Sequence, residues 1–456
     1  MTQFDPPTGN IGNVWNFIIR HWDDTIRFSP EDSGTLIGLP YPYTIPSRKD
    51  IFQEIYYWDT YFTSLGLIGT GRTEQALNNA RDLLALAERF GFVPNGNRTF
   101  YLKRSQLAYL GPLVGIVGAA LSDAAFCKQA APILEREYNF WAVGRLTPAG
   151  LSRPGNSATR EELLEFYDEA APRREILGRP KEACIENLSH AMAECEIWDF
   201  NPRFDDRARD FCPVDLNSNL YLYELQLAQW GEAAGRDQWM DRAAKRKAAI
   251  NDLCWDKDQG AYFDYDFVNR RRSPVLAAST FQPLWAGLAD QDQADLLVRK
   301  ALPKLEFPFG LSTGVPDKRN RTYQWAYPNL WPCLQHVAYR GLVRYGYIDE
   351  ARRIARKYID TVCRGFEATG DLWEKYNAAD GSTNTVNEAS YGLSPEVWYD
   401  SSSGSRPEVP QAGATPSMMG WTAGVFVDAV LFLQGDPNAP SRHFADRLLG
   451  LPARGN

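Results

Sequence analysis

The feature that most constrains the fold is a succession of amphipathic helical segments that starts near residue 52. Residues 73–90 place alanine and leucine at helical spacing, and Gly91 follows as a residue suited to end the helix. Other segments form pairs joined by a glycine-containing turn, which is typical of antiparallel helical hairpins. These pairs are 216–234 with 238–254, and 331–345 with 348–363.

Tight turns and long loops alternate along roughly a dozen predicted helices, which is more than one bundle axis can easily bury. A closed ring of hairpins with an inner and an outer layer can bury them. We therefore predict an all-α fold whose long loops collect at one end and form the functional surface. No βαβ rhythm is present, and no glycine-rich phosphate loop follows a strand.

The ends of the ring are less regular. Residues 12–27 predict a first helix, and the proline- and aromatic-rich stretch 29–46 predicts a loop packed on the body. We expect residues 1–50 to form one domain with a ring at 51–456. Residues 380–419 are rich in Gly, Ser and Pro, and we expect them to form a lid over the site.

Composition excludes several partners and compartments. The net charge is −8 and no basic run occurs, so neither nucleic acid nor an anionic membrane is an expected partner. No apolar run reaches about 18 residues, and the first ten residues lack the pattern of a secretory leader. The seven cysteines are odd in number and include no C-x-x-C pair. These features predict a cytoplasmic protein, and they give no indication of oligomeric state.

Candidate chemistry narrows to carboxylic acids. The four histidines form no metal-binding spacing, and no G-x-S-x-G nucleophile motif is present, so we expect neither a metal nor a cofactor. Three carboxylates, Asp59, Asp199 and Glu374, lie among aromatic residues. The chain has 14 Trp and 22 Tyr, and such rings stack on the C–H faces of sugars.

Two carboxylates on either side of a sugar are the requirement for glycoside hydrolysis. Asp199 lies between Trp198 and Phe200, and apolar walls favour the protonated form that a general acid needs. Lys375 beside Glu374 favours the ionised form that a general base needs. The structural alternatives are a helix-end cap for Asp199 and a surface ion pair for Glu374 with Lys375.

Several blocks of sequence resemble, in order, the trehalase family of inverting glycoside hydrolases. The resemblance covers about residues 50 to 430. It is carried by residues 54–62 (EIYYWDTYF), 94–106 (PNGNRTFYLKRSQ), 198–204 (WDFNPRF) with 213–217 (PVDLN), 324–332 (QWAYPNLWP) and 374–376 (EKY).

The resemblance implies an (α/α)6 toroid and hydrolysis with inversion, with Asp199 as general acid and Glu374 as general base. An inverting site holds its two carboxyl groups roughly 6.5–9.5 Å apart, which admits the attacking water. The residues that we expect to contact the sugar are Trp58, Asp59, Asn95, Arg104, Gln106, Arg160, Trp198, Gln324, Trp325, Glu408 and Trp421.

The chain departs from the family where the second glucose would bind. Ile51 stands where the family carries an Arg, with Arg48 as the nearest replacement, and Ala326 replaces an Asp. An insertion also separates Glu408 from Gly420. The leading hypothesis is an inverting α-glucosidase for a small α-glucoside, with trehalose first.

Three alternatives stay open. The same machinery could act on kojibiose, glucosylglycerate or mannosylglycerate, as in the related family of processing α-glucosidases. A lyase for polyanions would need a basic cleft, which a net charge of −8 does not favour. A non-catalytic sugar-binding toroid would be expected to lack Asp199 or Glu374, and both are present.

Overall fold

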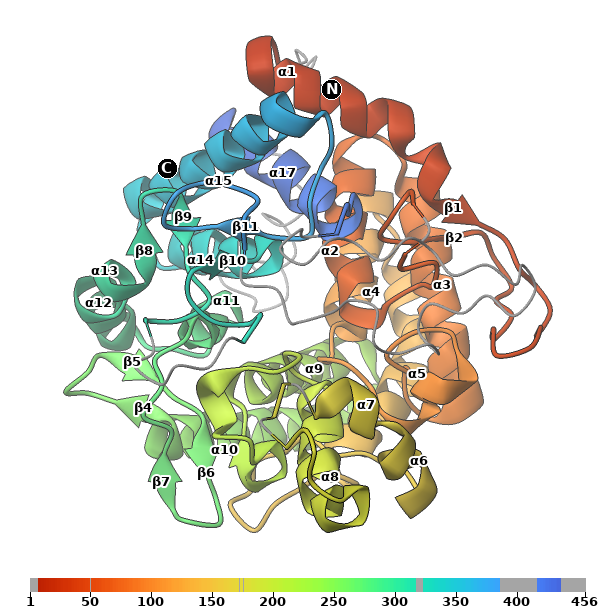
Figure 1. Cartoon of the computed structure of the whole chain (residues 1–456), viewed down its shortest axis with the longest axis vertical. Helices are drawn as coiled ribbons and strands as arrows, with labels where there is room; N and C mark the ends of the chain where they lie inside the picture. Colours follow the sequence, from red (N-terminus) through yellow and green to blue (C-terminus); the bar gives the residue numbers. More distant parts are fainter. Residues whose placement is uncertain are drawn as a thin grey trace.

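A computed structural model describes residues 7–49, 51–171, 173–174, 176–316, 323–385 and 416–435 (Figure 1). Its central feature is a closed ring of helices. Each ring helix contacts the next, and the last contacts the first. In ring order they are α2 (Tyr57–Gly69), α4 (Leu110–Leu121), α9 (Val214–Trp230), α11 (Gln282–Trp285), α14 (Pro332–Arg344) and α17 (Gly420–Leu433).

Ring helices are buried on nearly all sides, as expected for helices inside a second layer. The outer helices instead bury one face. Helix α15, for example, buries Ile354, Tyr358 and Val362 and exposes charged residues between them. The outer helices are α3 (Thr73–Phe90), α5 (Ala124–Ala142), α10 (Arg236–Leu253), α12 (Gln291–Lys300) and α15 (Ile348–Thr369). The predicted (α/α)6 toroid of helical hairpins is confirmed.

Helices α2 and α17 close the ring through a glycine contact. A Cβ added to Gly424 would overlap the carbonyl oxygen of Phe62, and one added to Gly66 would lie 2.7 Å from the Cα of Gly424. Only glycine therefore allows the two backbones to approach this closely. The first and last ring helices are joined without a covalent link.

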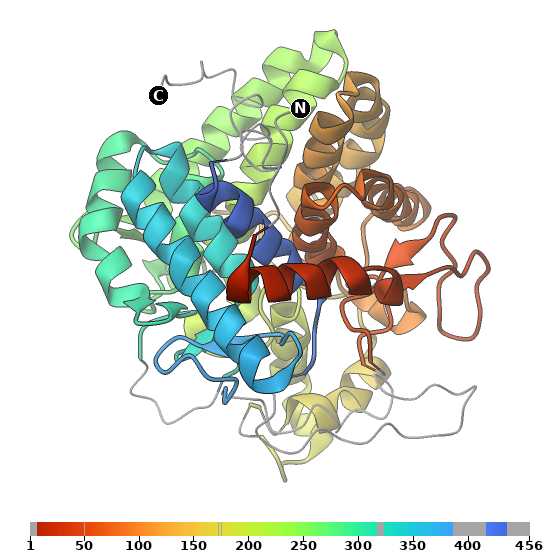
Figure 2. The same cartoon turned by 90° about the horizontal axis from the view of Figure 1, so that it is seen from above.

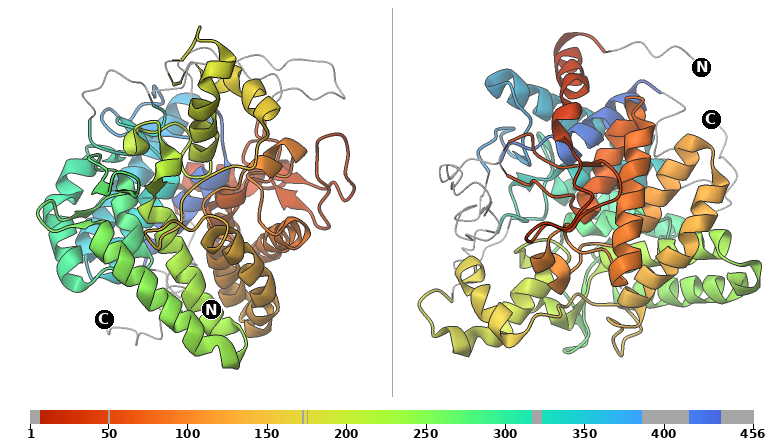
Figure 3. Two further views of the ribbon diagram at one scale, coloured as in Figure 1. Left: turned by 90° about the horizontal axis from the view of Figure 1, so that it is seen from below. Right: turned by 90° about the vertical axis from the view of Figure 1, so that its right-hand side faces the viewer.

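Short turns join inner helices to the outer helices that follow, whereas the return connections are long. The longest described return connection, between α5 and α9, carries α6 (Arg160–Glu165), α7 (Tyr167–Ala170) and α8 (Ile185–Glu194). These helices share a small hydrophobic cluster separate from the main core. Figures 2 and 3 show this segment (yellow) at one end of the helical body, the end that faces the viewer in Figure 1.

The N-terminal segment packs on the ring, but its helix is shorter than predicted. Helix α1 (Gly9–His21) ends before residue 27, and β1 (Ile26–Arg27) pairs antiparallel with β2 (Tyr43–Thr44). The Thr25 hydroxyl donates to the carbonyl of Trp22 at 2.7 Å and turns the chain. Tertiary pairing thus overrides the local helical pattern. Figure 2 shows α1 crossing the outside of the body, and it contacts α15.

Other regular elements are short and lie in the connections. They are β3 (Phe211–Cys212), β4 (Trp255–Asp256), β5 (Ala261–Tyr262), β6 (Tyr265–Asp266), β7 (Arg271–Arg272), α13 (Leu302–Leu305), β8 (Glu306–Phe307), β9 (Gly310–Leu311), β10 (Asn329–Leu330) and β11 (Tyr376–Asn377). Strand β10 pairs with β11, which ties the loop before α14 to the loop after α15. Most of the predicted lid at 380–419 lies outside the described residues.

Candidate active site

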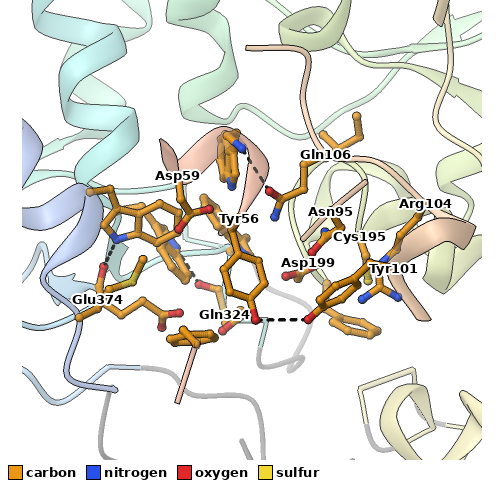
Figure 4. A pocket seen from close by; sticks show the side chains of 18 of the residues that line it. Tyr56, Asp59, Asn95, Tyr101, Arg104, Gln106, Cys195, Asp199, Gln324 and Glu374 are labelled. Carbon is orange, nitrogen blue, oxygen red and sulfur yellow. Dashed lines mark hydrogen bonds between the residues drawn. The ribbon is translucent and has the colours of Figure 1, made fainter. Parts of the chain in front are cut away.

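A pocket opens at the end of the ring where the inner helices begin (Figure 4). Every lining residue either precedes an inner helix or lies in its first turn, so the site is built from the segments that lead into the inner helices and from the starts of those helices. The pocket and its mouth enclose about 990 Å³. The lining residues are Phe52, Tyr56, Trp58, Asp59, Asn95, Tyr101, Arg104, Gln106, Glu169, Arg173, Cys195, Ile197, Asp199, Phe200, Gln324, Trp325, Trp331, Glu374, Met418 and Trp421.

Asp199 follows α8 and reaches the pocket from a strained turn. The next residue, Phe200, has a φ of 51°, which is unusual for a bulky side chain. Buried Glu194 holds this turn, because it accepts a hydrogen bond from the Asn201 backbone N–H at 2.6 Å and contacts the Arg174 guanidinium. The charged residues behind the pocket therefore fix the turn, and the Asp199 carboxyl group points into the pocket.

Burial raises the pKa of Asp199 above its usual value, because protein atoms replace the water that would solvate its charge. The positive charge of Arg104 and the nearby Cys195 thiol act in the opposite direction. Figure 4 shows all three side chains on the same side of the pocket. Burial therefore favours the protonated form of Asp199, which is the form that a general acid needs.

Glu374 lies on the other side of the pocket in Figure 4, in the loop that follows α15. Its side chain is 6% exposed and forms a 2.6 Å ion pair with fully buried Lys375. The backbone N–H donates to the carbonyl of Pro416 at 2.9 Å, and the backbone carbonyl accepts from the indole of Trp421 at 2.9 Å. Both bonds fix the carboxylate against the start of α17.

Asp59 lies in the first turn of α2, and the one hydrogen bond to its carboxyl group among the described residues comes from its own backbone N–H. Burial raises its pKa well above the usual value, and the negative charge of Glu374 adds to that shift. Arg104 lacks a side-chain hydrogen bond in the described part of the chain, and its Nε atom is buried. Unpaired buried groups that face a pocket indicate a polar ligand.

The loop before α4 supplies Asn95, Arg104 and Gln106. The Asn95 carbonyl accepts from the backbone of Tyr57 at 3.0 Å, and the Gln106 side chain accepts from the backbone of Trp58 at 3.3 Å. These bonds join the loop to the N-terminus of α2. The predicted contacts Trp58, Asp59, Asn95, Arg104 and Gln106 are thereby brought together in one wall.

A stack of indole rings forms the wall near α14. Trp325 and Trp331 are parallel at 3.8 Å, and Trp58 lies 5.5 Å from Trp325. Trp421 meets Trp331 edge-on at 5.5 Å. Gln324, at the edge of this stack, approaches the Lys375 ammonium at 3.5 Å through its side-chain oxygen. Rigid aromatic faces of this kind suit a pyranose ring.

Two predicted contacts, Trp198 and Arg160, do not line the pocket. Trp198 is 1% exposed and lies between the Arg203 guanidinium, 4.1 Å from its ring, and Trp325, so it supports the wall from behind. Arg160 is exposed on the first turn of α6, the helix that Thr159 caps. Glu408 lies outside the described residues. Arg48, considered as a replacement arginine, contacts Asp371 and is also absent from the pocket lining.

Sequence reasoning missed several lining residues. Glu169 and Arg173 come from α7 and the turn after it, far along the chain from every block that drew attention. Tyr101 lies inside one of those blocks but carried no distinguishing pattern. Cys195 entered the sequence analysis only in the search for zinc and disulfide patterns, although its position four residues before Asp199 could have placed it beside the acid.

Comparison with known proteins decides the family. The family model described as Trehalase matches residues 7–430 of the chain. The chain belongs to the trehalase family.

Relatives of this trehalase-family chain include a periplasmic trehalase of Pseudomonas aeruginosa, 32% identical over 81% of this chain and 70% of the relative. A periplasmic trehalase of Escherichia coli is 29% identical over 84% of this chain and 71% of the relative. Neutral trehalase Nth1 from Saccharomyces cerevisiae shares the fold with a TM-score of 0.70 at 25% identity, over 92% of this chain and 78% of the yeast chain. This trehalase-family chain is a glycosidase.

A more distant likeness confirms the fold alone. Mannosylglycerate hydrolase from Thermus thermophilus superposes with a TM-score of 0.59 at 15% identity, over 91% of this chain and 99% of that one. In the described ranges, no helix combines the length and apolar character needed to cross a membrane. The same residues contain no group of three or more His, Cys, Asp or Glu side chains placed to hold a metal ion.

The prediction of a cytoplasmic protein is wrong, since the bacterial relatives above are periplasmic trehalases. The cysteines, one of the features behind that prediction, did not support it. All seven are buried free thiols in the structure. A buried, widely separated thiol cannot pair in either an oxidising or a reducing compartment, so its unpaired state carries no information about location.

Proposed function

We propose that this trehalase-family chain hydrolyses trehalose, with inversion at the anomeric carbon. The observation that carries the proposal is the contrast between two carboxyl groups in one pocket. Burial raises the pKa of Asp199, whereas Glu374 is ion-paired with Lys375. One carboxyl group is thus poised to give a proton and the other to accept one.

In the proposed reaction, Glu374 removes a proton from a water molecule, whose oxygen attacks the anomeric carbon from the face opposite the glycosidic bond. The bond between that carbon and the glycosidic oxygen breaks as Asp199 gives its proton to the oxygen. The products are one glucose in the β configuration and one released glucose. Glu374 ends protonated and Asp199 ionised, and exchange with solvent restores both.

The remaining lining residues bind the sugar that is attacked. Burial favours the protonated form of Asp59, which can both donate and accept hydrogen bonds, and Asn95 and Gln106 add amide groups. Arg104 offers a planar set of donors. The indole stack provides a flat apolar surface for the C–H face of the ring.

Two substitutions test the assignment. Asp199→Asn and Glu374→Gln should each lower kcat on the best substrate by about 10²- to 10⁴-fold. Glu186→Gln on α8 and Glu367→Gln on α15 change exposed carboxylates on the helices that lead to the two sites, and they should keep wild-type rates. Wild-type rates in either pocket variant would contradict the assignment.

Substrate and stereochemistry need a direct assay. Purified protein is incubated separately with trehalose, kojibiose, glucosylglycerate and mannosylglycerate, and NMR follows the first product anomer. We expect trehalose to be hydrolysed fastest, with β-glucose appearing before mutarotation. Faster turnover of another glycoside would refute the substrate. The departing glucose of trehalose keeps its α configuration, so inversion releases α- and β-glucose together, and initial release of α-glucose alone would refute inversion.

A further inference from the structure

Two charged side chains border the pocket beside Asp199 from the α7 segment. Arg173 donates to the backbone carbonyl of Glu169 at 3.1 Å, and its guanidinium lies 3.5 Å from the Glu169 carboxylate. The Arg173 and Glu169 side chains are 12% and 21% exposed. The pair therefore sits largely out of bulk water while it lines the pocket.

A different arginine anchors this segment to the protein. Arg174 forms ion pairs with Glu194 and with Asp206, the latter at 2.6 Å. Apolar residues of α6, α7 and α8 pack in their own cluster beneath it. The position of α7 is thus set by Arg174 and by apolar packing, and the Glu169–Arg173 pair faces the pocket in front of them.

The pair lies on the side of the pocket where the leaving group must be. Glu169 and Arg173 are both close enough to Asp199 to influence its pKa, in opposite directions. The Arg173 guanidinium also lies 4.9 Å from the ring of Phe200, the residue after the acid. A general acid protonates the glycosidic oxygen, and that oxygen departs with the leaving group.

We propose that Glu169 and Arg173 bind hydroxyl groups of the departing sugar and so select a neutral, hydroxyl-bearing leaving group; this rests on the proposed acid role of Asp199. Arg173 supplies donors and Glu169 supplies acceptors, which together match the hydroxyl groups of a sugar. A leaving group that carried its own carboxylate would meet the negative charge of Glu169. The pair is a specificity determinant and takes no part in bond breaking.

Three substrates separate this role from its alternatives. Trehalose has a sugar leaving group, methyl α-glucoside has an alkyl leaving group that still needs the acid, and α-glucosyl fluoride releases fluoride without needing it. The variants are Glu169→Gln and Arg173→Ala. Asp168→Asn is the matched control, since Asp168 also lies on α7 but is 66% exposed and pairs with Lys181.

We expect both pocket variants to lower kcat/KM for trehalose at least about thirty-fold, because each variant loses one or two hydrogen bonds that involve a charged group. Rates on methyl α-glucoside and α-glucosyl fluoride should stay within about two-fold of wild type by the same reasoning, as should every rate of Asp168→Asn. A parallel fall on trehalose and methyl α-glucoside would overturn the proposal in favour of acid positioning. An equal fall on all three would indicate a structural role instead.

A pH profile gives a second readout on trehalose itself. Arg173→Lys keeps the positive charge near Asp199 but loses the planar donor set. We expect kcat/KM to be lower at every pH, while the fall of kcat/KM at alkaline pH (the alkaline limb of the profile) stays at the wild-type pH. A displaced limb would count against a pure binding role. If the wild type fails on trehalose but hydrolyses another α-glycoside, the proposed substrate is wrong. The same variant ratios measured on that glycoside then decide the role of the pair.

Discussion

The Lys375 ammonium lies 2.6 Å from the Glu374 carboxylate, and both side chains are buried. Lys375 also lies 4.8 Å above the ring of Trp331, so its charge is held between the proposed base and the indole stack. The sequence allowed these neighbours to be an ordinary surface pair. Both are buried instead, and Glu374 lines the pocket while Lys375 lies behind it.

Lys375→Met should weaken both activity and stability. The variant removes the buried ammonium that pairs with the Glu374 carboxylate. Loss of one partner in a buried ion pair lowers the free energy of unfolding by about 3 kcal/mol. We expect kcat to fall at least about ten-fold and the unfolding midpoint in urea to drop. Lys357→Met, which removes a partner of Glu306 on the outer surface of α15, is the control for loss of a lysine.

Cys195→Ala should move the alkaline limb of activity to higher pH. The thiol near Asp199 lowers the pKa of that carboxyl, so its removal raises this pKa further. A proton donor with a higher pKa stays protonated, and therefore active, at higher pH. A lost hydrogen bond corresponds to a shift of about half to one pH unit in the kcat/KM profile.

Two cysteine variants control that experiment. Cys195→Ser keeps a donor near Asp199 and should leave the limb close to its wild-type position. Cys184→Ala removes another buried thiol from the same hydrophobic cluster, away from the acid, and should not move the limb. An unmoved limb in Cys195→Ala would show that the thiol does not interact with the acid.

The ring and most of the site could be predicted because the patterns that indicate them lie within short, continuous stretches of sequence. The helical period is local, and the blocks around residues 58, 104, 199 and 374 each place a lining residue in the pocket. Trp198, expected to contact the sugar, does not line the pocket, because packing sets the direction of a side chain at a strained turn. It points toward Arg203, whose charge is satisfied by Asp215 and Asp264.

The α7 pair could not be predicted, for a different reason. Glu169 and Arg173 have the spacing of an ordinary exposed helical ion pair, and only the return of α8 beneath α7 brings them to the acid. Arg160, the arginine that we expected near the second sugar, is instead exposed on α6. Such tertiary placement leaves no local pattern in the sequence.

Glu137 should make the stability of the protein depend on pH near neutrality. This buried carboxyl group on α5 accepts hydrogen bonds from Tyr57 and, at 2.7 Å, from Tyr223, and so joins α5 to two ring helices. Burial raises its pKa to about 7, against the two hydrogen bonds, which lower it. The folded state therefore binds this proton more tightly than the unfolded chain does.

It follows that the contribution of Glu137 to stability is fully present below about pH 4.5 and is lost as pH rises through about 7. The loss corresponds to about 3 kcal/mol. Glu137→Gln mimics the protonated form, so its free energy of unfolding in urea should fall less than that of the wild type between pH 5.5 and pH 8. Glu135→Gln, exposed on the same helix, should keep the wild-type slope, and an identical slope in Glu137→Gln would refute the prediction.

Gly424→Ala should destabilise the ring at its closure. The added methyl group would meet the carbonyl of Phe62 on α2, and backbone cannot move aside as a flexible side chain can. Overpacking of this kind costs about 1–3 kcal/mol or more, which calorimetry would report as a lower Tm. Gly235→Ala is the control, since the nearest atom to its added methyl group is 3.7 Å away in the Trp239 ring. A Tm for Gly424→Ala equal to that of the control would mean that α2 and α17 separate without cost, and that the ring does not depend on their contact.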